Sequence, residues 1–357
     1  MKKFLFIICI FLTELFSASV SASGQVMDGA ATEDDKVDVA GILFGHIGDS
    51  YGWHITDWNG RHITVPLPCI VHSNTNGWHI FMSSKIMHGQ VYEGFFVAED
   101  GKFKDKLVEL GPDGEYVRPL DISITKNVCS LIFSSFLLLL IVLTTAHWYR
   151  KHNSEDEAPG GIAKVMEPLI ISINESLVKD NIGKDYKKYS PYLLTVFFFI
   201  LVNNIIGIIP FFPGGANVTG NIAVTLVLAL CTFIAVNLFA NKHYWKDILW
   251  PDVPLFLKFP IPLMQLIEIF GMFTKPLSLM VRLFANILAG HAMILGLVSI
   301  IFIVAKMGPV ICGSMTLATM LIGVFMDCLE LLVAFIQAYV FTMLSAVFIG
   351  MSRSEAE

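Results

Sequence analysis

Apolar residues follow two different patterns along this chain. Up to about residue 125, apolar runs are short and separated by Gly, Asn and Asp turns, which is typical of β-strands. From about residue 128 onward, the apolar runs become long enough to cross a bilayer, which takes about 20 residues. The sequence therefore predicts an all-α polytopic membrane domain over residues 126–357, preceded by a segment that is β-rich or irregular.

Five apolar runs predict five transmembrane helices, at residues 129–146, 191–209, 222–239, 260–306 and 309–351. The last two runs exceed what one crossing requires. A continuous helix over residues 261–304 would be about 66 Å long, whereas the hydrocarbon core is about 30 Å thick. We therefore expect these two long helices to tilt, to extend beyond the core or to break, with a kink at Pro276.

Basic residues indicate how the chain is oriented in the membrane. They follow the first span, precede the second and follow the third, at Arg150, Lys151, Lys184, Lys187, Lys188, Lys242 and Lys246. The positive-inside rule makes that side cytoplasmic, so a multi-pass protein of the inner (plasma) membrane would have its C-terminus inside. Residues 161–179 mix apolar and polar residues at helical spacing, which predicts an amphipathic helix on the membrane surface.

The N-terminus, MKKFLFIICIFLTELFSASVSASG, has the features of a secretory signal peptide over residues 1–23. Lys2 and Lys3 precede a short apolar core and then small residues, with cleavage expected near Ala22. An uncleaved anchor is the alternative. Either way, residues 24–125 would form a periplasmic N-terminal extension.

The extension is rich in histidine and repeats one tetrapeptide. GWHI occurs at residues 52–55 and 77–80, and β-like runs cover residues 37–44, 62–65 and 79–82. Six of the ten histidines lie here, at His46, His54, His62, His72, His79 and His88. A metal site is one interpretation, but no spacing matches a ligand pattern, so we favour a duplicated strand edge with solvated imidazoles. The six cysteines likewise match no zinc motif and no disulfide framework.

Ionisable side chains within the last two apolar runs carry the strongest functional signal. They are Glu268, Arg282, His291, Asp327 and Glu330, accompanied by the neutral Asn286 and Gln337. An arginine at the centre of a membrane helix costs at least about 2.5–3.5 kcal/mol, so such a residue is by default a functional candidate. Ion pairs that only lock helices together are the alternative, which we disfavour for so large a set because buried pairs are weak stabilisers.

Helical geometry places these residues around Arg282. Asn286 shares its face, whereas His291 points to the opposite face about 13.5 Å along the axis. If the two long helices are antiparallel and Gln337 is level with Arg282, then Glu330 falls near His291 on the periplasmic side. Glu268 then lies toward the cytoplasm. The pattern predicts a proton path interrupted by a charge that does not titrate.

These residues also carry a resemblance to a known family. The stretches KPLSLMVRLFANILAGH and LELLVAFIQAYVFTML closely resemble subunit a of the F-type ATP synthase, the stator of its membrane sector. SINESLVKD and PYLLTVFFFILVNNIIGIIP extend the resemblance, which runs from about residue 125 to the C-terminus. The R-L-x-x-N-x-x-A-G pattern followed by Q-A-Y-V-F is highly specific. The long N-terminal extension departs from the family's usual short segment.

The resemblance implies a role for each site residue. Arg282 would face the rotating ring of c subunits, attract its ionised carboxylate and block a leak between two offset half-channels. The periplasmic path would be lined or supported by Asn286, His291, Glu330 and Gln337. Glu268 is associated with the cytoplasmic side. Some family members have Glu then His at the positions of His291 and Glu330, and this sequence has the reverse order.

The resemblance implies the c-subunit ring, the b-subunit peripheral stalk, other ATP synthase subunits and membrane lipid as partners. The chain itself would be non-catalytic and would need no cofactor, and it contains no Gly-rich phosphate loop. The coupling ion, H⁺ or Na⁺, depends mainly on ligands in the c ring.

Composition and motifs bear on the alternatives. The chain is 55% hydrophobic and 15% charged with a net charge of −6, which excludes an ordinary soluble domain and offers no basic patch for nucleic acid. An intramembrane metal hydrolase would need a cluster such as H-E-x-x-H, which is absent. A secondary ion transporter would show internal repeats, and none is evident. A membrane-anchored periplasmic binding protein is the remaining alternative.

Overall fold

The computed structural model describes residues 48–58, 61–73, 77–87, 89–98, 101, 103–111, 115–152, 159–209, 214–250, 263–304 and 308–353. The predicted signal peptide, residues 1–23, and the β-like run at residues 37–44 lie outside these ranges. The chain divides into two units. Unit 1 comprises Met1–Phe133, Ile206–Val218 and His291–Leu329, and unit 2 comprises Ser134–Ile205, Thr219–Gly290 and Glu330–Glu357.

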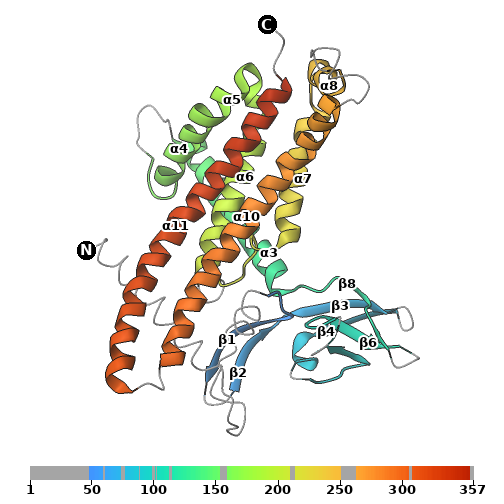
Figure 1. Cartoon of the computed structure of the whole chain (residues 1–357), viewed down its shortest axis with the longest axis vertical. Helices are drawn as coiled ribbons and strands as arrows, with labels where there is room; N and C mark the ends of the chain where they lie inside the picture. The colour runs from blue at the N-terminus through green and yellow to red at the C-terminus, as the bar shows by residue number, and fades with distance from the viewer. Residues whose placement is uncertain are drawn as a thin grey trace. The chain divides into compact units, whose positions relative to one another are not determined.

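Short antiparallel sheets form the first part of unit 1 (Figure 1). The strands are β1 (Gly52–Trp58), β2 (Arg61–Pro66), β3 (Pro68–Ser73), β4 (Gly77–Met82), β5 (Phe95–Val97), β6 (Leu107–Leu110), β7 (Tyr116–Val117) and β8 (Leu120–Asp121). They pair in the orders β1-β2, β4-β3-β8 and β5-β6-β7. The β-like runs at residues 62–65 and 79–82 lie in β2 and β4, and each GWHI copy begins a strand.

Alternation of side chains explains the core of these sheets. Along β3 every second residue is buried, starting at Cys69, as expected for a strand with one face against a core. The core consists of Tyr51, Cys69, Val71, Phe81, Ile86, Phe95 and Leu107. Burial raises the pKa of the Cys69 thiol to about 11. This cysteine is therefore a small apolar core residue and not a reactive thiolate.

His79 differs from the solvated imidazole that the GWHI repeat predicts. Its Nδ1 lies 2.6 Å from a carboxylate oxygen of Glu93, and its side chain is only 18% exposed. The hydrogen bond from His79 lowers the pKa of the Glu93 carboxyl. His72 packs edge-on against Trp78. Within the described ranges, no group of three His, Cys, Asp or Glu side chains is arranged to hold a metal ion.

Helices make up the rest of the described chain. They are α3 (Lys126–Lys151), α4 (Ala163–Ser172), the π-helical η2 (Ile173–Lys179), α5 (Asp180–Ile182), α6 (Tyr186–Ile208), α7 (Ile222–Leu238), α8 (Lys242–Leu249), α10 (Leu263–Val304) and α11 (Pro309–Arg353). Among the described residues, four helical segments are long and apolar enough to cross a membrane: Lys126–Lys151, Ala163–Ile208, Met264–Ile301 and Val310–Arg353. The chain is therefore a polytopic membrane protein.

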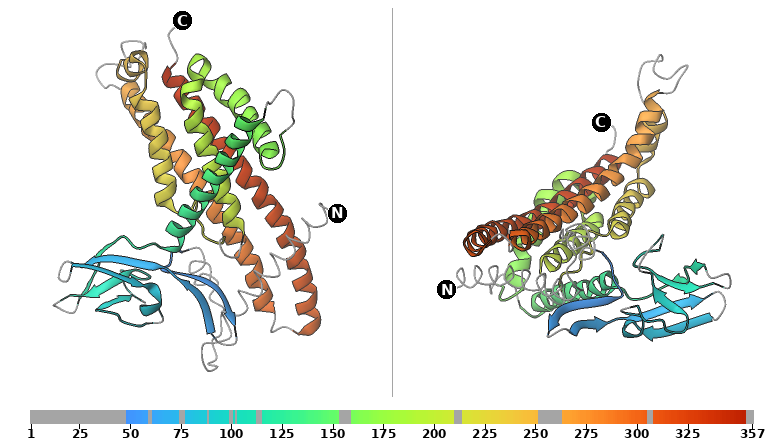
Figure 2. Two further views of the ribbon diagram at one scale, coloured as in Figure 1. Left: turned by 180° about the vertical axis from the view of Figure 1, so that it is seen from behind. Right: turned by 60° about the horizontal axis from the view of Figure 1, so that its bottom comes forward.

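The two long C-terminal helices, α10 and α11, run side by side in Figure 1 and in the left view of Figure 2. The 42 residues of α10 and the 45 residues of α11 correspond to about 63 Å and 68 Å. α10 continues through Pro276 without a break, which excludes one of the three expected arrangements, whereas the kink expected at this residue stays a prediction. Proline removes one backbone hydrogen bond but leaves the rest of the ladder intact, and packing against neighbouring helices maintains the helix.

The segment predicted to be amphipathic, residues 161–179, is helical and extends through α5. Its apolar face packs into the core of unit 2 through Met166, Ile173, Leu177 and Val178. The same core contains Leu193 and Phe197 of α6, Leu279 and Leu283 of α10, and Ala338 and Phe341 of α11. Small buried residues on α11, among them Ala334 and Ala338, allow the helices to approach closely.

Gly350 marks the closest approach between α11 and α5. A Cβ atom at this position would lie 2.0 Å from the backbone oxygen of Asn181, which cannot move without shifting the chain. Gly350→Ala should therefore lower the melting temperature of the purified protein, because overpacking costs about 1–3 kcal/mol. Gly313→Ala is the matched control, since a Cβ atom there meets nothing within 4 Å. Equal melting temperatures for the two variants would contradict this packing.

Candidate functional site

Arg282 lies on the outer face of α10. Leu279 and Leu283 on either side of it are buried in the core of unit 2, whereas Arg282 itself is exposed. This alternation follows from the helical period, which turns Leu279 and Leu283 toward the bundle and Arg282 away from it. No ion pair to Arg282 occurs in the part of the chain that the structure describes. A permanent charge therefore projects from an apolar helix near its middle.

Two other polar residues lie near the face of Arg282. Asn286 and Glu268 are each within about 40° of it around the helix, at about 6 Å and 21 Å along the axis. Both side chains are half-buried. The predicted sharing of a face by Arg282 and Asn286 follows from the helix that the structure shows over both residues.

Glu330 and Gln337 lie on the buried face of α11. Their side chains are 7% and 6% exposed, so a carboxyl group and an amide are held inside the protein at positions seven residues apart. Ala334 lies between them and is fully buried. Burying such groups is costly unless polar partners surround them, which indicates a polar seam along this side of the helix.

Gly290 on α10 makes room for the Glu330 carboxyl group. A Cβ atom at Gly290 would lie 2.8 Å from Oε1 and 3.2 Å from Cδ of Glu330. The carboxyl group is thus pressed against the backbone of α10, at the residue that precedes His291 in the sequence. Any side chain at position 290 would displace it.

His291 belongs to unit 1, where it is half-buried. A Cβ atom at Gly207 of α6 would lie 3.8 Å from His291 Nε2, an ordinary contact distance. The backbone oxygen of Ala216 lies at the same distance from that position. The imidazole therefore packs close to the end of α6 and the chain that follows it.

Two buried residues of the polar seam were not predicted as site residues. Asn204 of α6 donates from Nδ2 to the backbone oxygen of Ala334 at 3.3 Å, between Glu330 and Gln337 in the sequence. Its Oδ1 accepts a hydrogen bond of 2.7 Å from the Thr219 hydroxyl. The signal that identifies Asn204 is the Asn-Asn pair within the apolar run FFFILVNNIIGI, since polar residues inside a membrane helix are functional candidates.

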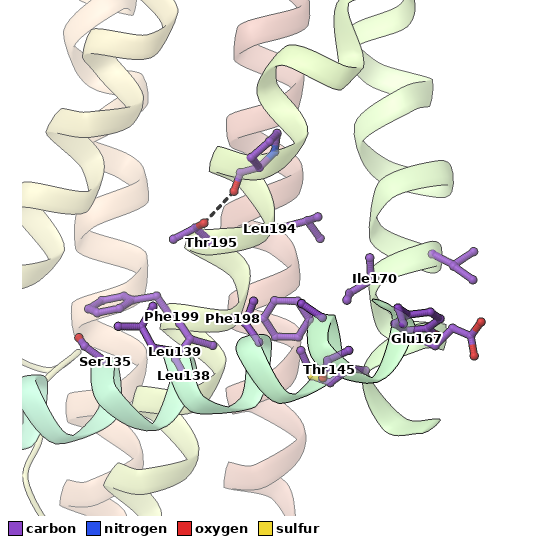
Figure 3. Close-up of a pocket in the computed structure, with 16 residues that line it drawn as sticks. Ser135, Leu138, Leu139, Thr145, Glu167, Ile170, Leu194, Thr195, Phe198 and Phe199 are labelled. Carbon is purple, nitrogen blue, oxygen red and sulfur yellow. Dashed lines mark hydrogen bonds between the residues drawn. The ribbon is translucent and has the colours of Figure 1, made fainter. Parts of the chain in front are cut away.

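Unit 2 also contains a cavity of about 850 Å³ between α3, α4 and α6 (Figure 3). Its walls are mostly apolar, with Leu138, Leu139 and Phe198 among the side chains that face it. Thr195 donates its hydroxyl to the backbone oxygen of Pro191, so its polarity is satisfied within α6. None of the predicted site residues lines the cavity, and its hydrocarbon walls are unsuited to moving an ion.

The helical part of the chain matches a known family. Residues 132–350 match the family model described as ATP synthase A chain. The chain belongs to the ATP synthase A chain family. This confirms the resemblance drawn from the stretches around Arg282 and Gln337. Residues 42–122 match a second family model, a domain of unknown function designated DUF8433.

Curated relatives are named as subunit a of ATP synthase. A protein of Chlorobaculum tepidum named ATP synthase subunit a 2 is 43% identical over 250 residues, which is 68% of this chain and 66% of the relative. ATP synthase subunit a of Chlorobium phaeobacteroides strain DSM 266 is 41% identical, over 69% of this chain and 71% of the relative. ATP synthase subunit a of Myxococcus xanthus is 39% identical, over 65% of this chain and 74% of the relative.

A substitution at Gly290 tests the contact with Glu330 in this ATP synthase A chain family member. Gly290→Ala displaces the carboxyl group at a cost of about 1–3 kcal/mol, and the same cost added to the barrier for proton transfer would slow pumping by about fivefold to 150-fold. The loss of rate is measured as ATP-driven proton pumping by inverted membrane vesicles. Gly296→Ala on the same helix should pump normally, because a Cβ atom there meets nothing within 4 Å. Equal rates for the two variants would show that the Glu330 position does not matter.

Proposed function

We propose that this chain is the stator subunit of the F-type ATP synthase membrane sector, forming two ion half-channels against the c-subunit ring. The observation that carries the proposal is the exposed Arg282, which has no ion-pair partner among the described residues. A guanidinium stays protonated where a lysine could neutralise. Because no described residue supplies its countercharge, we infer that a partner subunit supplies it at membrane depth.

A carboxyl group on each c subunit supplies that countercharge. The group travels through lipid in its neutral, protonated form, because a charge facing hydrocarbon is expensive. Beside Arg282 the ionised form is favoured, since a nearby positive charge lowers a carboxyl pKa. The proton is released there and another is taken up on the other side of the arginine. Each proton contributes about 2.3 kcal/mol per 100 mV of membrane potential.

The surface around Arg282 suits a closely approaching helix. Ser278, Ala285 and Ala289 are exposed like Arg282, and all three lie within about 60° of it around α10. Small side chains let two helices come near each other in a membrane. A c-subunit carboxyl group can thus reach the guanidinium without bulky side chains in the way.

The periplasmic half-channel is proposed to involve Asn286, His291, Glu330 and Gln337, with Asn204 as an addition. The buried polar seam on α11 and the contact between Glu330 and Gly290 support this assignment. Glutamate and histidine side chains can pass protons near neutral pH once their surroundings adjust their pKa values. Glu268, which lies on the side of Arg282 toward the start of α10, is assigned to the cytoplasmic half-channel.

The proposed topology has five crossings, which are the four long apolar helical segments and the shorter helix α7. Its 17 residues span about 26 Å, close to the hydrocarbon thickness of about 30 Å. The N-terminus then lies in the periplasm and the C-terminus in the cytoplasm of an inner-membrane protein. Residues 1–23 act as a signal peptide, residues 24–125 form the periplasmic extension, and the amphipathic segment at residues 161–179 lies at the membrane surface.

The proposed partners are the c-subunit ring and the b-subunit peripheral stalk, together with the remaining synthase subunits and lipid. The chain contributes no catalytic group of its own, and ATP synthesis takes place in the soluble head that the ring drives. Membership of the ATP synthase A chain family does not favour a secondary transporter.

Arg282→Ala tests the proposal directly. Without the fixed charge, no countercharge forces the ring carboxyl group to ionise, so coupled ATP synthesis in membrane vesicles should fall below detection. Lys275→Ala on the same helix is the matched control. The Lys275 ammonium group lies 5.6 Å from the ring of Phe348, and its loss should leave coupled synthesis largely intact. Normal synthesis by Arg282→Ala would exclude the proposed role.

An exchange of two residues tests the periplasmic path. His291→Glu combined with Glu330→His should retain more ATP-driven proton pumping than either His291→Ala or Glu330→Ala, because both titratable groups are kept at one height. Vesicles with matched amounts of assembled complex give the comparison. A double variant no more active than the single alanine variants would refute the common height of the two side chains.

A further inference from the structure

The sheet β4-β3-β8 is apolar on both of its faces. Its inner face contributes Cys69, Val71 and Phe81 to the core. The other face is formed by the residues between these positions, because side chains alternate along a strand. We call this the outer apolar face, and its members are Pro68, Ile70, His72, Trp78, Ile80, Met82, Leu120, Ile122 and Ile124.

The strand register arranges these nine residues in three rows across the sheet. The first row is Met82, Pro68 and Ile124, the second is Ile80, Ile70 and Ile122, and the third is Trp78, His72 and Leu120. Ile80 is 74% exposed and Trp78 is 59% exposed. Exposed apolar residues are normally scattered singly, so a contiguous group of this kind marks an interaction surface.

A short, hydrogen-bonded connection joins this sheet to the first membrane helix. The backbone N–H of Ile122 donates to Ile70, and that of Ile124 donates to Pro68. The N–H of Lys126, the first residue of α3, donates to the backbone oxygen of Ser50. Ile122 and Ile124 are thus bonded to β3 and Lys126 to Ser50, two residues before β1, so the sheet is not attached by a free linker.

The connection places the outer apolar face near the bilayer. At about 3.3 Å per residue, Ile124, Ile122 and Leu120 lie within about 7, 13 and 20 Å of the start of α3, and their row neighbours on β3 and β4 lie about 5 and 10 Å further across the sheet. The headgroup layer of one leaflet is about 5–8 Å thick. Ile124 in the first row is therefore at headgroup depth, whatever the angle of the sheet, if α3 enters the hydrocarbon core near its first residues.

We propose that the outer apolar face docks on phospholipids of the outer leaflet. It carries no Lys, Arg, Asp or Glu, and His72 is its one ionisable side chain. Tryptophan, here Trp78, is enriched where membranes meet water. Val128 and Ile132, near the start of α3, are exposed apolar residues as well. In this arrangement the β-sheets of the extension lie against the membrane surface beside the first span.

This inference rests on the proposed membrane crossing by α3, and the experiment separates the two. The photocrosslinker p-benzoylphenylalanine is introduced at Ile80, at Val91 or at Leu143 of the full-length protein in its native membranes. Val91 is 61% exposed but lies outside the three-stranded sheet, and Leu143 is a 64% exposed residue of α3. After irradiation, mass spectrometry of the purified chain identifies the adducts.

A lipid adduct at Ile80 at least fivefold above that at Val91 is the expected result, with a lipid adduct at Leu143 as well. An adduct at Ile80 with a polypeptide, either a second copy or another protein, would overturn the inference. So would an Ile80 signal no higher than that of Val91. If Leu143 forms lipid adducts while Ile80 does not, the docking fails and the membrane crossing by α3 stands.

Discussion

An arginine at membrane depth needs a countercharge, and the architecture of the helical part follows from that need. Arg282 is held at the exposed side of α10 because Leu279 and Leu283, about 60° and 100° from it around the helix, anchor the adjoining face in the core. A helix free to rotate would turn the guanidinium toward the bundle or toward headgroups, since long basic side chains reach for polar surroundings. The tight apolar core therefore has a functional purpose, which is to present one charge at a fixed height and direction.

Polar groups in the helical part are divided between two environments. Arg282 is exposed where a partner can reach it, whereas Glu330, Gln337 and Asn204 are buried between helices. Buried side chains have fixed positions and can hold water or pass protons, but they cannot meet a moving partner. The exposed charge can do so. In the proposed function, this separation would let one chain both conduct an ion part of the way and force its transfer to another subunit.

Much of the helical part is predictable from hydrophobic runs, because a membrane helix needs little more than length and apolarity. The run at residues 222–239 matches α7, and the predicted face shared by Arg282 and Asn286 follows from the helical period alone. Contacts between helices cannot be predicted from hydrophobic runs in this way. The approach of Gly290 to Glu330 depends on how two helices pack. A single glycine in the sequence does not indicate which residue of another helix will lie beside it. The helix α10 also continues through Pro276, because packing around a helix can outweigh a residue's local preference. His79 found a carboxylate partner 14 residues away, which the GWHI repeat does not encode.

Exposed apolar surface has a different meaning in each part of the chain. On α10 and α11 it is expected, since lipid and other subunits cover membrane helices. On a sheet in water the same surface would be unfavourable by about 25 cal/mol for each Å², and five large side chains of the outer apolar face are exposed. The hydrogen-bonded connection from Leu120 to Lys126 removes this conflict, because it keeps the sheet within reach of the bilayer. A long flexible linker would let the domain leave the membrane and expose the face. The short connection and the apolar face are thus two parts of one arrangement, and each is advantageous only because the other is present.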